Sequence, residues 1–228
     1  MSQREQLIKK FKNNISLNKS LSNYNWFNLG GPAEYFFKPK NQEQLIEFVR
    51  ENKKNKLQIT ILGAGSNTLI RDNGIKGVVI KLGPAFSEIK LIDKNIIEAG
   101  AATLDRKISN FAKDKGIGNF EFLSCIPGSI GGAVIMNSGC YGNDISKILQ
   151  SIKVLDIKNG TEKEIKRKEI NFFYRGTDLP SDLIITSVKL KGILTSKDLI
   201  EKKQIKINQA KKISQPSQVK TCGSTFKN

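Results

Sequence analysis

Two glycine-rich segments hold residues whose types and spacing suit phosphate binding. In the first, ITILGAGSNTLI at residues 59–70, apolar residues lead directly into the glycine turn at 63–67. Glycines permit positive φ angles and let backbone N–H groups converge on an anion, and Ser66, Asn67 and Thr68 can add side-chain donors. Thr68 stands where the Rossmann dinucleotide motif has its third glycine. A phosphate site and a tight strand-to-helix turn are therefore both open interpretations.

The second segment, FLSCIPGSIGGAVIMNSGCYGND, spans residues 122–144. It groups small residues at 127–129, 131–133 and 137–139, and such residues let a backbone approach a flat or phosphorylated ligand closely. The alternative is the tightly packed start of a helix, in which residues 133–136 bury against a sheet. Two candidate phosphate cradles in one chain strengthen each other, and together they suggest a dinucleotide bound in an extended form.

A third stretch, NFFYRGTD at residues 171–178, places the phenol of Tyr174 beside the guanidinium of Arg175. The planar fork of an arginine is well suited to bind a carboxylate. The alternative is a surface arginine at the end of a strand that carries Phe172 and Phe173.

The chain contains no histidine, which limits the chemistry that it can perform. Proton transfer has to use serine, tyrosine, lysine, cysteine or a carboxylate, and a Ser-His-Asp triad and a histidine-rich metal site are both excluded. The three cysteines, Cys125, Cys140 and Cys222, form no C-x-x-C pair. Their odd number argues against a disulfide framework and a structural zinc site, so we predict no metal and a cytoplasmic location with reduced thiols.

The formal charge is +17, from 38 basic and 21 acidic residues. The lysines are spread along the whole chain, without a basic block interleaved with aromatic residues, so we predict no nucleic-acid partner. A basic surface would still attract phosphate-bearing small molecules. No apolar run approaches the 18 residues of a membrane span. Residues 4–15 have helical spacing of apolar side chains, which predicts an amphipathic helix, with binding to a membrane surface as an alternative role.

Alternating strand-like and helix-like segments indicate an α/β or α+β chain. One helix is predicted over 42–53, with Asn41 as its cap. A second is predicted between a cap at Thr103 and an end at Gly116, and a third runs from Ser196 to about Ile213. The predicted strands are a buried one at 58–62, others at 77–82, 95–99 and 183–190, and a hairpin of 151–156 with 164–165. A change of composition places a boundary near residue 195.

In their order and spacing, these motifs resemble the UDP-N-acetylenolpyruvoylglucosamine reductase family, flavoenzymes of bacterial peptidoglycan synthesis. The matching stretches are NWFNLGGPAE at 25–34, LGAGSN at 62–67, GNFEFLSCIPGSIGGA at 118–133, MNSGCYG at 136–142, YR at 174–175 and GSTFKN at 223–228. The compact interval between Arg175 and Ser224 is similar to the shorter subclass of that family.

The resemblance implies an α+β fold: a two-lobed FAD-binding domain of the vanillyl-alcohol-oxidase (PCMH) type, followed by the start of a C-terminal α/β substrate domain. We expect an N-terminal helical segment at 1–22, the FAD-binding domain at 23–195 with lobes of about 23–100 and 101–195, and the incomplete substrate domain at 196–228. The protein is expected to act as a monomer.

The resemblance also implies roles for individual residues. The catalytic residues would be Arg175, which stabilises an enolate, and Ser224, which donates a proton. Substrate, a UDP-sugar enolpyruvyl ether, would contact Tyr174, Arg175 and Asn228. NADPH would be the co-substrate that reduces FAD. The cofactor-binding residues would be Gly63, Ala64, Gly65, Ser66, Asn67, Thr68, Ile126, Pro127, Gly128, Ser129, Gly131, Gly132, Asn137 and Gly139.

The sequence also departs from the family pattern. The family continues beyond GSTFKN with a segment that carries an active-site glutamate, so we expect this sequence to be a truncated form with little or no turnover. Gly176 and Thr177 stand where a bulkier residue and a serine are common, which leaves the wall of the substrate pocket open. The alternative functions are an FAD-dependent oxidoreductase of the same fold with another substrate, and a basic nucleotide- or nucleic-acid-binding domain.

Overall fold

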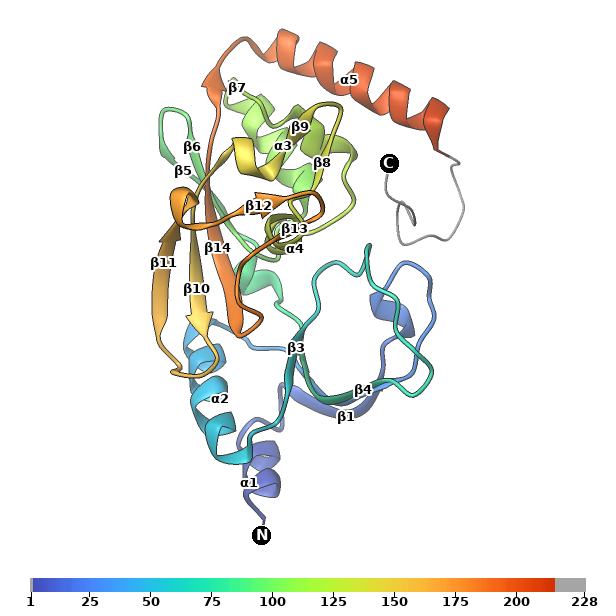
Figure 1. Ribbon diagram of the computed structural model, residues 1–228, viewed down its shortest axis with the longest axis vertical. Helices are drawn as coiled ribbons and strands as arrows, with labels where there is room; N and C mark the ends of the chain where they lie inside the picture. The colour runs from blue at the N-terminus through green and yellow to red at the C-terminus, as the bar shows by residue number, and fades with distance from the viewer. Residues whose placement is uncertain (1, 216–228) are drawn as a thin grey trace.

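The computed structural model describes residues 2–215, and in it two β-sheets form the two lobes of the molecule (Figure 1). The first sheet has the order β1-β2-β4-β3. Strands β2 and β3 both run parallel to β4, and β1 is antiparallel to β2. The bounds are β1 Ile15–Ser20, β2 Pro32–Phe37, β3 Ile59–Ile61 and β4 Ile75–Ile80.

Aromatic packing holds the first sheet against two helices, α1 (Gln3–Lys10) and α2 (Gln42–Asn55). The rings of Phe37 and Phe48 stack with their centroids 4.0 Å apart, and Phe11 meets both rings edge-on. Buried aromatic side chains contribute large apolar areas, so this trio ties the N-terminal helix, β2 and α2 into one unit.

The second sheet is antiparallel throughout and has the order β11-β10-β14-β6-β5. Its strands are β5 Ile89–Asp93, β6 Ile96–Gly100, β10 Leu149–Asp156, β11 Glu162–Lys166 and β14 Leu183–Lys191. The predicted hairpin is confirmed, because β10 pairs with β11. Asp156 accepts hydrogen bonds from the backbone N–H groups of Lys158 and Asn159 in its turn.

Helices cover the second sheet and its upper end in Figure 1. The largest are α3 (Asp105–Asp114) and α5 (Lys197–Ser214), and α5 lies across α3, where the side chain of Gln204 donates to the hydroxyl of Ser109 at 2.8 Å. The shorter elements are α4 Ile130–Ile135, the 3-10 helices η1 Ser22–Tyr24, η2 Pro84–Phe86, η3 Glu121–Cys125, η4 Ile145–Lys147 and η5 Arg167–Glu169, and the strand pairs β7 Ile117–Gly118 with β15 Ile193–Leu194, β8 Gly139–Cys140 with β9 Asn143–Asp144, and β12 Phe172–Phe173 with β13 Gly176–Thr177.

Two expected boundaries differ from the sheet topology. The segment 1–22, expected to be helical, also contributes strand β1 to the first sheet. The expected lobe boundary at residue 100 would place β5 and β6 in the first lobe, whereas both pair within the second sheet. The chain crosses between the sheets near η2, and the separate substrate domain from residue 196 stays a prediction.

Two local predictions were wrong for reasons of tertiary structure. Thr103 does not cap α3: Leu104 is the N-cap residue, and the buried Thr103 hydroxyl has no hydrogen-bond partner among the described residues. Strand β3 forms as predicted but is not buried, because it lies at an edge of its sheet and leaves Ile61 38% exposed. No helix in residues 2–215 combines the length and the apolarity that crossing a membrane requires.

Candidate functional site

A cleft of about 650 Å³ collects side chains and backbone from both lobes. It lies within the range of small-molecule and cofactor sites. Its walls are the turn after β3, the end of β4, the segment between β6 and α3, the loop before α4, the β12–β13 hairpin and β14. The main lining residues are Ile61 to Thr68, Lys81, Leu82, Ala101, Ala102, Leu104, Asp105, Ile126 to Ser129, Gly131 to Ala133, Ile135, Met136, Ser138, Tyr174, Arg175, Leu183 and Ile185.

The first glycine loop lines the cleft over its whole predicted length, from Gly63 to Thr68. Gly65 has a φ angle of +75°, and a Cβ there would lie 2.1 Å from the carbonyl oxygen of Tyr24. Only glycine therefore fits this turn, and its carbonyl accepts a hydrogen bond from the backbone of Trp26. A second glycine, Gly63, would place a Cβ 2.9 Å from the hydroxyl of Ser129, so the absence of side chains lets the two loops approach each other.

The second glycine loop, residues 126–129, faces the same cleft, and α4 begins directly after it. The Ser66 hydroxyl donates to the carbonyl of Pro127 at 2.5 Å and joins this loop to the first. The backbone N–H of Gly131 donates to the carbonyl of Ala101, where α4 packs against the end of β6. The second segment therefore begins a tightly packed helix, and its loop lines the cleft. Its approach to a ligand stays a prediction.

Asn137 and Gly139, predicted to bind the cofactor, do not line the cleft. The amide of Asn137 accepts from the backbone N–H of Ser146 and donates to the carbonyl of Phe173 at 3.3 Å. Gly139 lies in β8, where a Cβ would come within 2.4 Å of the Asn143 carbonyl. Both positions serve the packing behind the wall, which explains why small or amide residues occupy them.

Tyr174 and Arg175 form the two-residue turn between β12 and β13, and both line the cleft. Arg175 has a φ angle of +62°, which is uncommon for a residue with a side chain and is found at functional sites. Its guanidinium carbon lies 5.4 Å from the centre of the Tyr174 ring. The bond from Asn137 to Phe173 holds this hairpin to the second glycine segment.

Two ionisable residues in the cleft were missed from the sequence, Lys81 and Asp105. The Lys81 ammonium donates to the carbonyl of Gly63. Burial lowers the pKa of Lys81, and the positive charge of Lys38 lowers it by a smaller amount. Asp105 is fully buried, neither carboxyl oxygen has a hydrogen-bond partner within residues 2–215, and burial raises the pKa of Asp105 to about 8. Asp105 is thus a neutral acid at pH 7. An aspartate at a helix start and a lysine at a strand end are ordinary sequence features, so nothing local signals their position.

Two thiols lie behind the second glycine loop. The Sγ atoms of Cys125 and Cys140 are 3.0 Å apart, and both cysteines are free. A hydrogen bond from Cys140 and the nearby ammonium of Lys211 lower the pKa of the Cys125 thiol, and the same hydrogen bond raises that of Cys140. Over residues 2–215, no group of three histidine, cysteine, aspartate or glutamate side chains could hold a metal ion.

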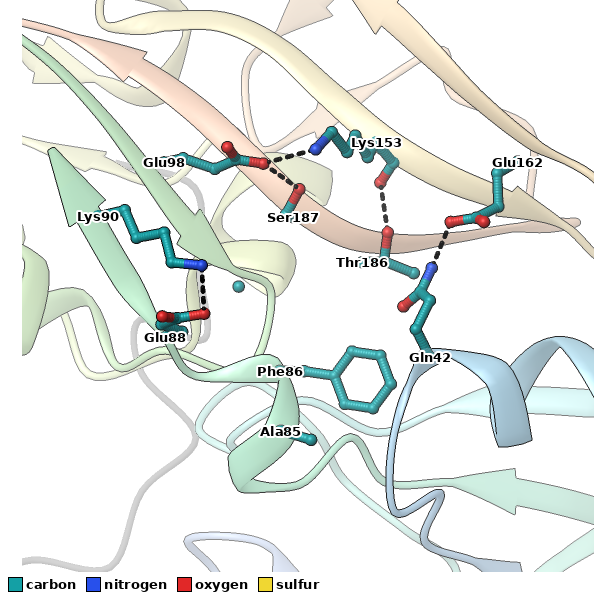
Figure 2. Close-up of a pocket in the computed structure, with 11 residues that line it drawn as sticks. Gln42, Ala85, Phe86, Glu88, Lys90, Glu98, Lys153, Glu162, Thr186 and Ser187 are labelled. Carbon is teal, nitrogen blue, oxygen red and sulfur yellow. Dashed lines mark hydrogen bonds and ion pairs between the residues drawn. The ribbon is translucent and has the colours of Figure 1, made fainter. Parts of the chain in front are cut away.

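A second hollow of about 350 Å³ lies between α2, η2 and the second sheet, and Figure 2 shows its lining. Its charged side chains pair with each other: Lys90 with Glu88 and Lys153 with Glu98, each at 2.8 Å. Gln42 of α2 donates to Glu162 of β11 at 2.5 Å across the rim. Because these groups satisfy one another, we place the candidate site in the larger cleft. The predicted residues Ser224 and Asn228 lie outside the described residues.

Comparisons with known proteins identify the fold. Residues 33–166 match the FAD binding domain family, and the predicted two-lobed FAD-binding fold is confirmed. The structure is similar to UDP-N-acetylenolpyruvylglucosamine reductase from Thermus caldophilus, with a TM-score of 0.81 and 30% identity over 94% of this chain and 74% of that chain. It shares its fold with p-cresol methylhydroxylase, at a TM-score of 0.62 and 14% identity over 85% of this chain and 44% of that chain.

The sequence relatives point to one family. The chain is 46% identical over 225 residues to the UDP-N-acetylenolpyruvoylglucosamine reductase of Pelagibacter ubique, which covers 97% of this chain and 74% of that protein. It is 44% identical over 209 residues to the protein of the same name from Rickettsia typhi, covering 92% of this chain and 70% of that protein. The chain therefore belongs to the UDP-N-acetylenolpyruvoylglucosamine reductase family.

Proposed function

We propose that the protein reduces UDP-N-acetylglucosamine enolpyruvate to UDP-N-acetylmuramate for peptidoglycan precursor synthesis, with FAD as cofactor and NADPH as reductant. The proposal rests on two observations that agree. The chain is 46% identical to a family member along 97% of its length, and its cleft is built from the family's glycine motifs. We place the reaction in the cytoplasm, in keeping with the free thiols of Cys125 and Cys140.

The residues of the cleft fit FAD. Two glycine-rich loops line the cleft and meet at the Ser66–Pro127 hydrogen bond. In the same wall, the buried carboxyl oxygens of Asp105 have no partner in the part of the chain that the structure describes. Residues 63–68 would hold the diphosphate, with the ammonium of Lys81 as the cation beside them. Residues 126–129 with Gly131 and Gly132 would line the rest of the cofactor, while Asn137 and Gly139 would support that wall from behind. When bound, FAD supplies hydride-transfer chemistry.

Arg175 is the residue of the described cleft that suits the substrate. Hydride addition to an enolpyruvyl double bond leaves negative charge that spreads into the neighbouring carboxylate. A guanidinium presented at a hairpin turn can stabilise this charge with two parallel hydrogen bonds. Tyr174 stacks beside it and would contact the same substrate. Asn228 as a substrate contact and Ser224 as the proton donor stay predictions from the family resemblance.

A flavin assay separates this proposal from its alternatives. Purified protein, or protein reconstituted with FAD, should be yellow and should bleach with NADPH under anaerobic conditions. Colour should return when the UDP-sugar enolpyruvate is added, and UDP-N-acetylglucosamine, which lacks the enolpyruvyl group, is the matched control. A yellow protein that the substrate leaves reduced would favour an oxidoreductase with another substrate.

Two finer points follow for the 228-residue chain. We infer that it binds FAD in the cleft described above. We also infer a monomer. Ser224→Ala should spare flavin reduction by NADPH and slow the second half-reaction, whereas equal loss in both halves would count against a proton-donor role. Sedimentation velocity measures the oligomeric state directly.

A further inference from the structure

The two thiols behind the cofactor cleft are placed to form a bond. The Sγ atoms of Cys125 and Cys140 are 3.0 Å apart, and a disulfide is about 2.0 Å long, so closure needs a movement of about 1 Å. Neither cysteine belongs to the proposed reaction, and neither lines the cleft itself. The pairing depends on tertiary structure, since the two residues lie at the end of η3 and in β8.

The position of the pair gives such a bond a structural effect. Cys125 directly precedes the loop 126–129, and Cys140 directly follows the support residues 137–139. The chain between them forms one wall of the cleft, including Gly131, Gly132 and Met136. A covalent link between Cys125 and Cys140 would therefore close a loop around this wall and restrict its movement.

The electrostatics of the pair give the two sulfur atoms different roles. The hydrogen bond from Cys140 and the positive charge of Lys211 favour a thiolate at Cys125. The side chain of Lys211 reaches the carbonyl of Cys125 itself, so α5 holds the ammonium against this residue. Cys140 keeps its proton and is the more exposed of the two thiols. A thiolate with an adjacent resolving thiol is the usual arrangement of an oxidisable pair.

We propose that Cys125 and Cys140 form a redox modification site, which a hydroperoxide oxidises to an internal disulfide. The Cys125 thiolate attacks the terminal peroxide oxygen, the O–O bond breaks, and the leaving oxygen takes a proton and departs as water or alcohol. The Cys140 sulfur then attacks the resulting sulfenic sulfur, loses its proton, and a second water leaves. The pair gives up two electrons, and the peroxide takes them. This inference is independent of the proposed substrate.

The sequence offers a direct test of the link. Its two methionines are Met1 and Met136, so cyanogen bromide cuts the chain between Cys125 and Cys140. In a Cys222→Ser variant, these are the remaining cysteines. After treatment of the folded protein with one equivalent of hydrogen peroxide and alkylation of free thiols, cleavage should leave the two fragments joined on a non-reducing gel. Dithiothreitol should separate them.

Matched variants and a stability measurement complete the test. Adding Cys140→Ser should abolish the link and leave a sulfenic acid at Cys125 that dimedone traps. The oxidised Cys222→Ser protein should melt higher than its reduced form, by on the order of 5 °C. The proposal is overturned if both thiols remain alkylatable after peroxide, or if the link forms equally well in protein unfolded by guanidinium, since the fold would then not pair them.

Discussion

The hydroxyl of Ser66 donates a hydrogen bond of 2.5 Å to the carbonyl oxygen of Pro127, across a sequence separation of 61 residues. This contact joins the two glycine loops, one from each lobe, at the cleft that both line. The proposed dinucleotide site therefore depends on how the two lobes are held together, as well as on the local shape of each loop.

Ser66→Ala should weaken FAD binding about fivefold, because a buried hydrogen bond contributes roughly 1 kcal/mol and this one sets the spacing of the loops. Quenching of flavin fluorescence on titration of apoprotein measures the dissociation constant. Ser87→Ala is the control, since that hydroxyl donates within its own turn, to the carbonyl of Gly83, and Ser87 lies outside the cleft. Equal affinities for both variants would contradict the role given to Ser66.

Lys81→Met should raise the dissociation constant of FAD about tenfold at low salt and reduce its salt dependence. Lys81 lines the cleft beside Gly63, where the diphosphate would lie, so its positive charge would attract the diphosphate, and salt would screen this attraction. Isothermal titration at two ionic strengths separates this effect from a loss of fold. Lys76→Met, exposed on β4, the strand that directly precedes Lys81, should leave the affinity within twofold.

Asp105→Asn should stabilise the apoprotein at pH 7, by on the order of 2 kcal/mol. The folded pKa of Asp105 is raised to about 8 from 3.8, so between these values the folded protein holds a proton that the unfolded chain has released. The stability of the parent protein should therefore fall as pH rises from about 4 to about 8, and that decline should be weaker in the variant. Urea unfolding at several pH values measures both.

Asp93→Asn is the matched control for Asp105, because Asp93 is exposed on β5. Its replacement should change the free energy of unfolding by less than about 0.5 kcal/mol at each pH. A pH dependence that is the same for the parent and for Asp105→Asn would show that the Asp105 carboxyl is ionised in the folded protein.

Arg175→Met should leave flavin reduction by NADPH intact and slow flavin reoxidation by substrate at least a hundredfold, as expected when a charge that stabilises the transition state is lost. Arg175→Lys should recover part of the rate, since it restores charge without the planar fork. Stopped-flow absorbance resolves the two half-reactions. Arg106→Met, exposed on α3, is the control, and equal slowing of both half-reactions by Arg175→Met would contradict a substrate role.

Local patterns predicted the elements whose signals lie within a few residues. Helix α2 has the predicted cap, in which Asn41 accepts from the backbone of Gln44, and its buried face includes Leu45, Phe48 and Val49. The hairpin of β10 with β11 follows from its Asn-Gly turn. These signals survive in the structure because caps and turns are satisfied by neighbours in sequence.

The features that could not be predicted from the sequence depend on contacts between distant segments. The hydroxyl of Thr103 fits the cap pattern, but the helix begins one residue later, with Leu104 as its N-cap residue. The motif that contains Asn137 contributes Met136 and Ser138 to the cleft, whereas the Asn137 side chain bonds to the backbone of Phe173 and Ser146. The Asp105 carboxyl becomes part of the cleft because the second glycine loop folds over the start of α3. There the backbone N–H of Asp105 donates to the carbonyl of Gly128.

The most direct test of the central claim is a single-turnover experiment on FAD-reconstituted protein that NADPH has reduced under anaerobic conditions. Adding UDP-N-acetylglucosamine enolpyruvate should restore the absorbance of oxidised flavin and form one UDP-N-acetylmuramate per flavin, detected by mass spectrometry. UDP-N-acetylglucosamine should leave the flavin reduced. A protein that takes up no FAD, or a reduced flavin whose reoxidation is unchanged by the enolpyruvyl substrate, would contradict the proposed function.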